Sequence, residues 1–326
     1  MGWSQQSFLS LGPEGFHQVA YTDWGEPANS HVVLCVHGLS RNARDFDRLA
    51  GAFQAKCRVV CMDVVGRGAS AWLDDKAGYS FQTYLGDAAA LIARITAPVK
   101  PRLIDRFRAK LSGTIPMTRI DWVGTSMGGL IGMLLAAKSG SPIRRLVMND
   151  VGPFVPWSSL IRLKGHIGSP GLFASLEEVE AYVRRACASF GPIDDGWWRH
   201  LTDNAAESID GNRYQLRYDP HISRGMPVHL DPELSVGLNL LRGIDLWSVW
   251  DQVQCPVLIL RGTDSDVLTA DVVAEMVRLK PSTSVVEFPG VGHAPSLSTP
   301  DQIQAIGNFL LAPDQQPTAP NRFAPP

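Results

Sequence analysis

The sequence predicts an α/β fold in which helices cover both faces of a mostly parallel sheet. Short apolar runs rich in β-branched residues recur along the chain, and they do not alternate between apolar and polar residues. Strands of this kind are buried on both faces. Segments with apolar residues at helical spacing stand between these runs. Strands that alternate with helices form parallel sheets, so the pattern predicts this class of fold.

The predicted elements follow one another in a regular order. The first buried strand ends at the pair His37-Gly38, and the second ends in glycines. The expected elements are strand 32–36, helix 41–54, strand 58–66, helix 81–95, strand 120–124, helix 128–138, strand 145–150, strand 256–262, strand 283–288 and helix 300–310.

The alternation stops in three places. Residues 151–250 contain helical spacing and many tryptophans but no strand-like run, which predicts a helical cap inserted into a core of 1–150 and 251–312. Residues 96–118 are basic and bounded by prolines, and we expect a surface excursion whose purpose the sequence does not reveal. The proline-rich segment 313–326 has no apolar face and is expected to be a disordered tail.

The composition is that of an ordinary globular chain. Of its 326 residues 45% are hydrophobic and 19% are charged, which predicts a sizeable core without membrane spans. The net charge of −2 gives nucleic acid or an anionic membrane no general attraction, so a small molecule is the expected partner. Five cysteines without framework spacing, and no secretory signal pattern, predict a cytoplasmic protein. The oligomeric state is not indicated.

The strongest local motif is Gly124-Thr125-Ser126-Met127-Gly128, a G-x-S-x-G sequence between a predicted strand and a predicted helix. A sharp turn in this context presents a serine hydroxyl above the carboxyl edge of the sheet, and small residues two positions before and after it make room. The helix that follows points its N–H groups at the same place. Ser126 is therefore the predicted nucleophile.

A serine hydroxyl needs a base, and the base needs a carboxylate to orient it. Among eight histidines, His293 is the best placed, because it lies in a glycine-flanked loop after the last predicted strand. Asp266 is the preferred carboxylate, because the apolar pair after it suggests a loop that turns inward. Asp264 and Asp150 also follow buried strands and remain alternatives.

Acyl transfer also requires donors for the negative charge of the tetrahedral intermediate. The loop after the first buried strand is the expected place for one donor, and the start of the helix after Ser126 is the place for the other. We therefore predict that the main-chain N–H groups of Leu39 and Met127 form an oxyanion hole, with His37 framing it. This chemistry requires no cofactor and no metal.

Five motifs in the order VHGLS (36–40), DVVGRGAS (63–70), GTSMGG (124–129), RGTDSD (261–266) and GVGHAP (290–295) resemble the α/β-hydrolase superfamily over about residues 31–310. This resemblance implies an eight-stranded, mostly parallel sheet with a helical cap inserted after the sixth strand. Through DWVGTSMGGLIGM and NDVGPF the chain is also similar to bacterial carboxylic-ester hydrolases, and to the intracellular hydrolases of 3-hydroxybutyrate oligomers.

The predicted function is that of a serine hydrolase, which cleaves a carboxylic ester through an acyl-enzyme. Oligomers of 3-hydroxybutyrate, or another small hydroxyacid ester, are the expected substrates. Hydrolysis of a C–C bond of the meta-cleavage type, lactone opening and acyl transfer use the same residues and stay open. The alternative from another functional class is a non-catalytic ligand receptor with the fold of a hydrolase. A protein that only binds a ligand needs no activated nucleophile.

Two further residues are candidates for binding the substrate. Arg41 follows the proposed oxyanion donor closely in sequence and has the geometry to hold a substrate carboxylate. An ion pair with Asp45, one helical turn further on, is the competing interpretation. Trp157, at the start of the predicted cap, is a candidate for an apolar wall of the pocket.

Overall fold

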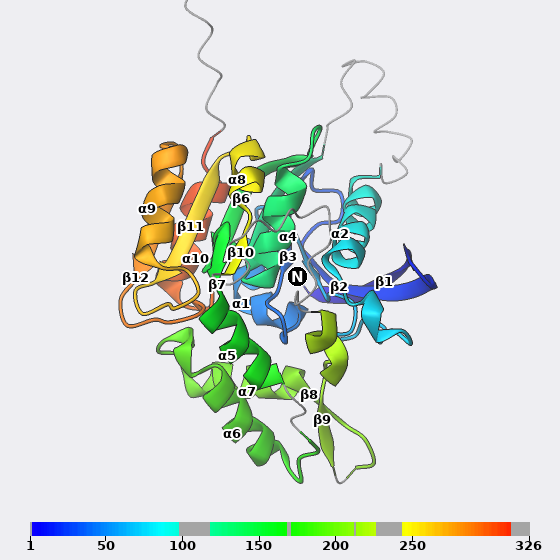
Figure 1. The fold of residues 1–326 in the computed structure, drawn as a ribbon. Coiled ribbons are helices and arrows are strands. Elements are labelled where there is room, and N and C mark those ends of the chain that lie inside the picture. Colours follow the sequence, from blue (N-terminus) through cyan, green and yellow to red (C-terminus); the bar gives the residue numbers. More distant parts are fainter. Residues whose placement is uncertain (1, 98–117, 168–170, 212, 226–242, 314–326) are drawn as a thin grey trace, which may run out of the picture.

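The computed structural model describes residues 2–97, 118–167, 171–211, 213–225 and 243–313 (Figure 1). Its centre is an eight-stranded sheet with the order β1-β2-β4-β3-β5-β6-β11-β12. β1 and β2 are antiparallel, β2 is antiparallel to β4, and the remaining neighbours are parallel. The expectation of a mostly parallel, eight-stranded sheet is therefore confirmed. The strands are β1 Trp3–Gly12, β2 Gly15–Trp24, β3 His31–Val36, β4 Arg58–Met62, β5 Arg119–Thr125, β6 Ile143–Asn149, β11 Val257–Gly262 and β12 Ser284–Phe288.

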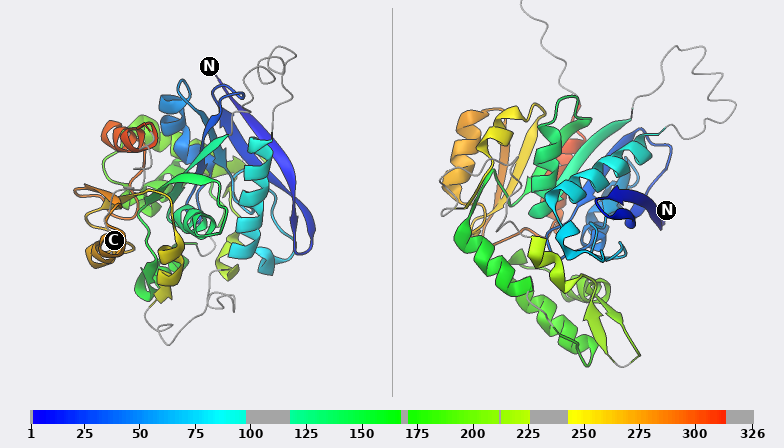
Figure 2. Two further views of the ribbon diagram at one scale, coloured as in Figure 1. Left: turned by 90° about the horizontal axis from the view of Figure 1, so that it is seen from above. Right: turned by 45° about the vertical axis from the view of Figure 1, so that its right-hand side comes forward.

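Helices cover both faces of this sheet (Figure 2). Side chains of β3 alternate between two apolar clusters, since Leu34 packs on one face and Cys35 on the other. The first cluster includes residues of α2, α4, α8 and α9, and the second includes residues of α1 and α10. These helices are α1 Asp47–Phe53, α2 Phe81–Thr96, α4 Met127–Ala136, α8 Trp247–Gln252, α9 Ala270–Leu279 and α10 Pro300–Leu310, with short 3₁₀ helices at Ala43–Phe46 and Lys76–Gly78.

Helix α2 illustrates how the sequence determines an element. The hydroxyl of Ser80 accepts a hydrogen bond from the N–H of Thr83 and so caps the first turn. Ala88, Leu91 and Ile95 recur at helical spacing and are buried against the sheet. The helix thus forms where the apolar periodicity predicts it.

A mainly helical segment enters the chain after β6, the sixth strand along the sequence, as expected. It lies below the sheet in Figure 1 and in the right-hand view of Figure 2. β7 and β10 pair with each other, as do β8 and β9. The division of the chain at residues 150 and 251 remains a prediction. The segment contains β7 Phe154–Pro156, α5 Trp157–Ile167, α6 Leu176–Ala186, 3₁₀ helix Ala188–Phe190, α7 Asp195–Ala205, β8 Ala206–Ser208, β9 Tyr214–Leu216, 3₁₀ helix Pro220–Gly225 and β10 Gly243–Asp245.

The antiparallel hairpin of β1 and β2 is an addition to the sequence-based prediction. β1 is exposed along most of its length, so it does not form the apolar run by which the buried strands are recognised. Most of the basic 96–118 segment and nearly all of the predicted tail, residues 98–117 and 314–326, lie outside the described residues.

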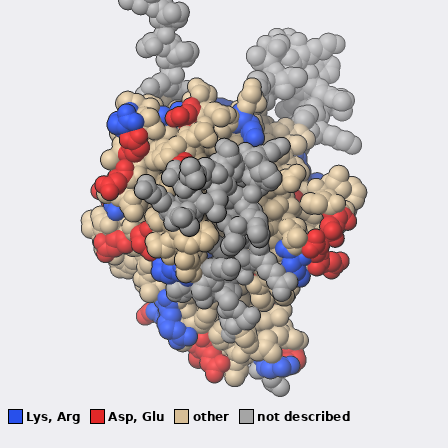
Figure 3. Space-filling model, viewed as in Figure 1, with Lys and Arg blue, Asp and Glu red and all other residues tan. Residues whose placement is uncertain are grey.

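The surface mixes charges of both signs. On the face shown in Figure 3, basic and acidic side chains are interspersed around the molecule, in keeping with the net charge of −2. Among the helices that the structure describes, none combines the length and the hydrophobicity that a membrane span requires.

Candidate active site

Ser126 occupies a strained turn between β5 and α4. Its φ of 52° and ψ of −115° lie outside the regions that an L-residue favours. The glycines of the motif make this turn sterically feasible. A Cβ on Gly124 would lie 2.2 Å from the carbonyl oxygen of Gly128, and one on Gly128 would lie 2.0 Å from that of Val36. The G-x-S-x-G pattern is therefore a direct consequence of how closely α4 approaches β3 and β5.

His293 connects Ser126 to a buried carboxylate. Its Nε2 atom lies 2.9 Å from Oγ of Ser126, and its Nδ1 atom lies 2.7 Å from Oδ2 of Asp150. The carboxylate of Asp150 has no exposed surface and accepts two further hydrogen bonds, from the N–H of Gly262 at 3.0 Å and the hydroxyl of Ser265 at 2.5 Å. This is the geometry in which a histidine can take a proton from a serine while a carboxylate holds its ring.

The prediction that Asp266 orients His293 is wrong. The side chain of Asp266 is 52% exposed and binds Arg162 of α5 through contacts of 2.8 and 2.6 Å. Asp264, the first alternative, accepts a hydrogen bond from the hydroxyl of Thr263. The loop after β11 does turn inward, but it contributes the hydroxyl of Ser265 to Asp150 and does not supply the carboxylate.

Leu39 and Met127 lie where an oxyanion hole is expected, and both line the cavity beside Ser126. Met127 is the first residue of α4, and the first N–H groups of a helix have no partner within it. Within the part of the chain that the structure describes, neither the N–H of Leu39 nor that of Met127 donates a hydrogen bond. Both donors are therefore available to a substrate oxygen.

His37 fixes the orientation of the Leu39 N–H group. Its ring is fully buried, and burial lowers the pKa of His37 to about 3, so the ring is neutral near pH 7. Its Nε2 atom accepts a hydrogen bond from the N–H of Val64, which leaves Nδ1–H to donate to the carbonyl of Gly38 at 2.7 Å. That carbonyl belongs to the same planar peptide as the N–H of Leu39, so holding one orients the other.

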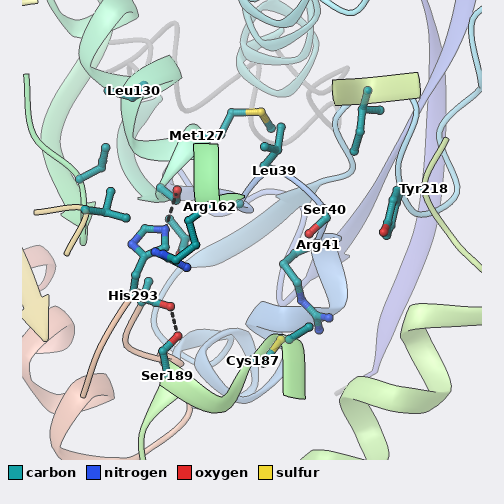
Figure 4. A pocket seen from close by; sticks show the side chains of 18 of the residues that line it. Leu39, Ser40, Arg41, Met127, Leu130, Arg162, Cys187, Ser189, Tyr218 and His293 are labelled. Atoms are coloured by element: carbon teal, nitrogen blue, oxygen red, sulfur yellow. Dashed lines mark hydrogen bonds between the residues drawn. The ribbon is translucent and has the colours of Figure 1, made fainter. Parts of the chain in front are cut away.

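The cavity above Ser126 has a volume of about 180 Å³ and lies between the sheet edge and the helical segment (Figure 4). Its walls are mostly apolar and come from both parts, including Leu130, Val155, Phe190 and Leu216. Ser189 of the helical segment donates its hydroxyl to the carbonyl of His293, a contact that Figure 4 marks with a dashed line. The predicted wall residue Trp157 does not line this cavity, so that assignment is not supported.

Among the residues that the structure describes, two arginines line the cavity, and each is paired with an aspartate. Arg41 binds Asp45 through Nε and Nη2 at 2.8 and 2.7 Å, which confirms the competing interpretation of an ion pair. Arg41 also lines the cavity, and its binding of a substrate carboxylate stays a prediction. Burial lowers the pKa of Arg41, but the charge of Asp45 outweighs it and holds that pKa above its ordinary value. Arg162, which the sequence analysis did not select, is 40% exposed and belongs to α5.

Among the residues that the structure describes, no cluster of three or more histidine, cysteine, aspartate or glutamate side chains is arranged to hold a metal ion. The described cysteines are free thiols, and all except the partly buried Cys255 are buried.

Comparison with known proteins gives consistent matches over most of the chain. A family model described as the alpha/beta hydrolase family matches residues 33–305. The chain is 40% identical over 305 residues to a 3-hydroxybutyrate-oligomer hydrolase from Cupriavidus necator, covering 92% of this chain and 95% of that protein. It is 35% identical over 288 residues to a pimeloyl-(acyl-carrier protein) methyl ester esterase from Nitrosomonas europaea, with coverages of 86% and 96%.

Solved structures agree with these matches. An alpha/beta hydrolase from Novosphingobium aromaticivorans superposes with a TM-score of 0.75 at 30% identity and covers 95% of this chain and 98% of its own. The sequence match at 33–305 includes all five motifs, from VHGLS to GVGHAP.

Proposed function

The chain belongs to the alpha/beta hydrolase family, and from that premise we propose that it hydrolyses carboxylic esters through an acyl-enzyme formed on Ser126. At the level of the enzyme class, the prediction of a carboxylic-ester hydrolase is confirmed by the relatives. The single observation that supports the mechanism is the position of His293, which lies within hydrogen-bond distance of both the Ser126 hydroxyl and the Asp150 carboxylate.

In the proposed reaction, Oγ of Ser126 attacks the ester carbonyl while Nε2 of His293 accepts the hydroxyl proton. The negative oxygen of the tetrahedral intermediate is held by the N–H groups of Leu39 and Met127. The C–O bond of the ester breaks, and His293 returns its proton to the departing alcohol. Water then attacks the acyl-enzyme with the same proton transfers, and the carboxylic acid leaves. Asp150 stabilises the imidazolium in both halves of the cycle.

We place oligomers of 3-hydroxybutyrate in the substrate class. The likeness to the hydrolase from Cupriavidus necator supports this assignment, and the mostly apolar cavity suits short aliphatic acyl groups. Such an oligomer carries a carboxylate at one end. Arg41 and Arg162 line the cavity and are the candidates to bind this carboxylate. In this structure, each forms an ion pair with an aspartate. We also propose a cytoplasmic location, in keeping with the free thiols.

A substrate panel tests the proposal. Wild type and Ser126→Ala are assayed with p-nitrophenyl esters, 3-hydroxybutyrate dimers and trimers, lactones and β-diketone acids. We expect turnover of the esters and oligomers by the wild type and loss of about 10⁶-fold in kcat in the variant, as when a serine nucleophile is removed elsewhere. Turnover that persists in Ser126→Ala would contradict the mechanism for that substrate class. A preference for diketone acids would contradict the assigned reaction, and a preference for lactones would contradict the assigned substrate.

A further inference from the structure

Arg67 is a fully buried arginine directly behind the proposed oxyanion hole. It lies in the turn after β4, within the motif DVVGRGAS, and its exposed fraction is 0%. Its Nε–H group donates to the carbonyl of Leu39 at 2.9 Å, and Nη2 lies 3.9 Å from Sδ of Met127. Its Nη1 group donates to the carbonyl of Val65 at 2.7 Å and the hydroxyl of Tyr84 at 2.9 Å. One guanidinium therefore contacts both residues whose N–H groups face the substrate.

The charge of Arg67 has no counter-ion in the part of the chain that the structure describes, because none of the ion pairs there includes it. The acid nearest to it in the same motif, Asp63, directs both carboxylate oxygens to main-chain N–H groups, those of Ala43 and Ala69. Buried charges in proteins are normally paired. Arg67 is held instead by carbonyl oxygens, a phenol and a thioether, and two of these contacts are with Leu39 and Met127.

The contacts also complete the support of the Leu39 main chain. His37 holds the peptide that ends in the Leu39 N–H group, and Arg67 holds the carbonyl of the same residue. Both peptide planes that flank Leu39 are thereby fixed by fully buried side chains. A donor that is already oriented needs no reorganisation when negative charge develops on the substrate oxygen.

We propose that Arg67 is a positioning residue of the oxyanion hole, which holds the Leu39 main chain in place and adds a positive charge, without a counter-ion among the described residues, behind the donors that bind the oxygen of the tetrahedral intermediate. This inference rests on the acyl-enzyme mechanism proposed above. Since the ester oxygen is neutral before attack and negative after it, a nearby buried charge favours the intermediate over the bound substrate. Loss of Arg67 should therefore lower kcat and leave KM nearly unchanged.

Arg67→Gln and Arg67→Lys are compared with the wild type on p-nitrophenyl butyrate. The affinity of a trifluoromethyl ketone is measured in parallel. Addition of the Ser126 oxygen to this ketone passes the hydroxyl proton to His293 and leaves an anionic oxygen in the oxyanion hole. For Arg67→Gln we expect a loss of roughly 10- to 100-fold in kcat, less than about a threefold change in KM, and a parallel loss in ketone affinity. Arg67→Lys keeps the charge, so its losses should stay below about tenfold.

Arg145→Gln is the matched control for a merely structural effect. Arg145 is also a buried arginine held by main-chain carbonyls, those of Phe309, Leu310 and Ala312, at the end of α10. We expect this variant to lower the melting temperature while kcat and ketone affinity stay within about threefold of the wild type.

The inference is overturned if folded Arg67→Gln keeps the kcat and ketone affinity of the wild type within about threefold, or if kcat falls without any change in ketone affinity. If Arg67→Gln does not fold, Arg67→Met, which also removes the charge, takes its place. Losses of about tenfold or more in both kcat and ketone affinity support the role of the charge, and values within about threefold of the wild type contradict it. Ser126→Ala separates the two proposals: turnover in this variant refutes the acyl-enzyme itself, whereas a dead Ser126→Ala beside a fully active Arg67→Gln refutes only the role of Arg67.

Discussion

The identity of the carboxylate that orients His293 gives the sharpest prediction, because two aspartates compete for the role. We expect Asp150→Asn to abolish nearly all activity and Asp266→Asn to leave it nearly intact. The two substitutions are chemically identical. Asp266 belongs to the loop after β11, and Asp150 accepts a hydrogen bond from Ser265 of the same loop. They differ in position, since Asp150 lies 2.7 Å from Nδ1 of His293 and Asp266 lies against Arg162.

The expected magnitude follows from burial. The Asp150 carboxylate is completely buried and accepts hydrogen bonds from three groups, among them the ring of His293. An asparagine at this position removes the negative charge that stabilises the imidazolium and can reverse the donor and acceptor pattern. The same change in another Ser-His-Asp enzyme lowers kcat about 10⁴-fold, which corresponds to about 5.5 kcal/mol in activation free energy.

Asp266→Asn removes only a partly exposed ion pair. With side chains 40% and 52% exposed, the pair of Arg162 and Asp266 is screened by solvent, and such pairs contribute about 0–1 kcal/mol to stability. We expect its kcat to remain within about threefold of the wild type.

The assay is steady-state hydrolysis of p-nitrophenyl butyrate by both variants, after circular dichroism has shown that each is folded. Asp150→Asn with more than about a tenth of wild-type kcat would refute the assignment. A loss of about 10³-fold or more in Asp266→Asn would refute it equally, and would restore the carboxylate that the sequence analysis preferred.

Three further predictions follow from the glycines, the buried histidine and the cavity cations. Gly128→Ala puts a Cβ 2.0 Å from a carbonyl of β3 and should lower the melting temperature by more than about 5 °C. Gly86→Ala in α2, where a Cβ would meet no atom within 4 Å, should leave the melting temperature unchanged or raise it, and thermal unfolding of both variants tests this difference. Burial lowers the pKa of His37 to about 3 from 6.5, so its contribution to stability is present above about pH 6.5 and is lost as the pH falls toward 3, by up to about 1.4 kcal/mol per pH unit. Burial raises the pKa of Asp63 to about 6, and this shift makes the free energy of unfolding fall as the pH rises from about 4 to 6. To isolate the effect of His37, urea unfolding at several pH values compares wild type with His37→Gln. An equal slope of the unfolding free energy against pH in the two proteins would contradict the prediction. Arg41→Ala and Arg162→Ala should each raise KM for a 3-hydroxybutyrate dimer about tenfold, with little effect on kcat or on a neutral ester; an arginine whose removal leaves that KM unchanged does not bind the substrate carboxylate.

The positions of Ser126 and His293, which lie within hydrogen-bond distance of each other, were predictable from the sequence because their surroundings are encoded locally. The glycines beside Ser126 are required by contacts of about 2 Å, and a steric requirement of this kind leaves few residue choices. The loop after β12, the last strand, contains a single histidine, so the choice of His293 was unambiguous there. The buried parallel strands were predictable for a similar reason, since burial on both faces demands uninterrupted apolar runs.

Asp150 was harder to identify because the choice depends on the order of strands in the sheet. Carboxylates follow the carboxyl ends of both β6 and β11, and these two strands are neighbours. Which one reaches His293 depends on a loop conformation, with Asp150 at a φ of 56°. Whether Trp157 lines the cavity could not be predicted from the local sequence either, because the packing of the helical segment on the sheet decides which side chains face the cavity.

Acid-quench mass spectrometry of the enzyme during turnover tests the central claim most directly. Wild type is mixed with an excess of p-nitrophenyl butyrate, quenched within milliseconds, digested and searched for a butyryl group. The mechanism predicts this adduct on the peptide that contains Ser126, with a burst of p-nitrophenol of matching amplitude, and neither in Ser126→Ala. An acyl group on any other residue, or the same burst from Ser126→Ala, would contradict the account.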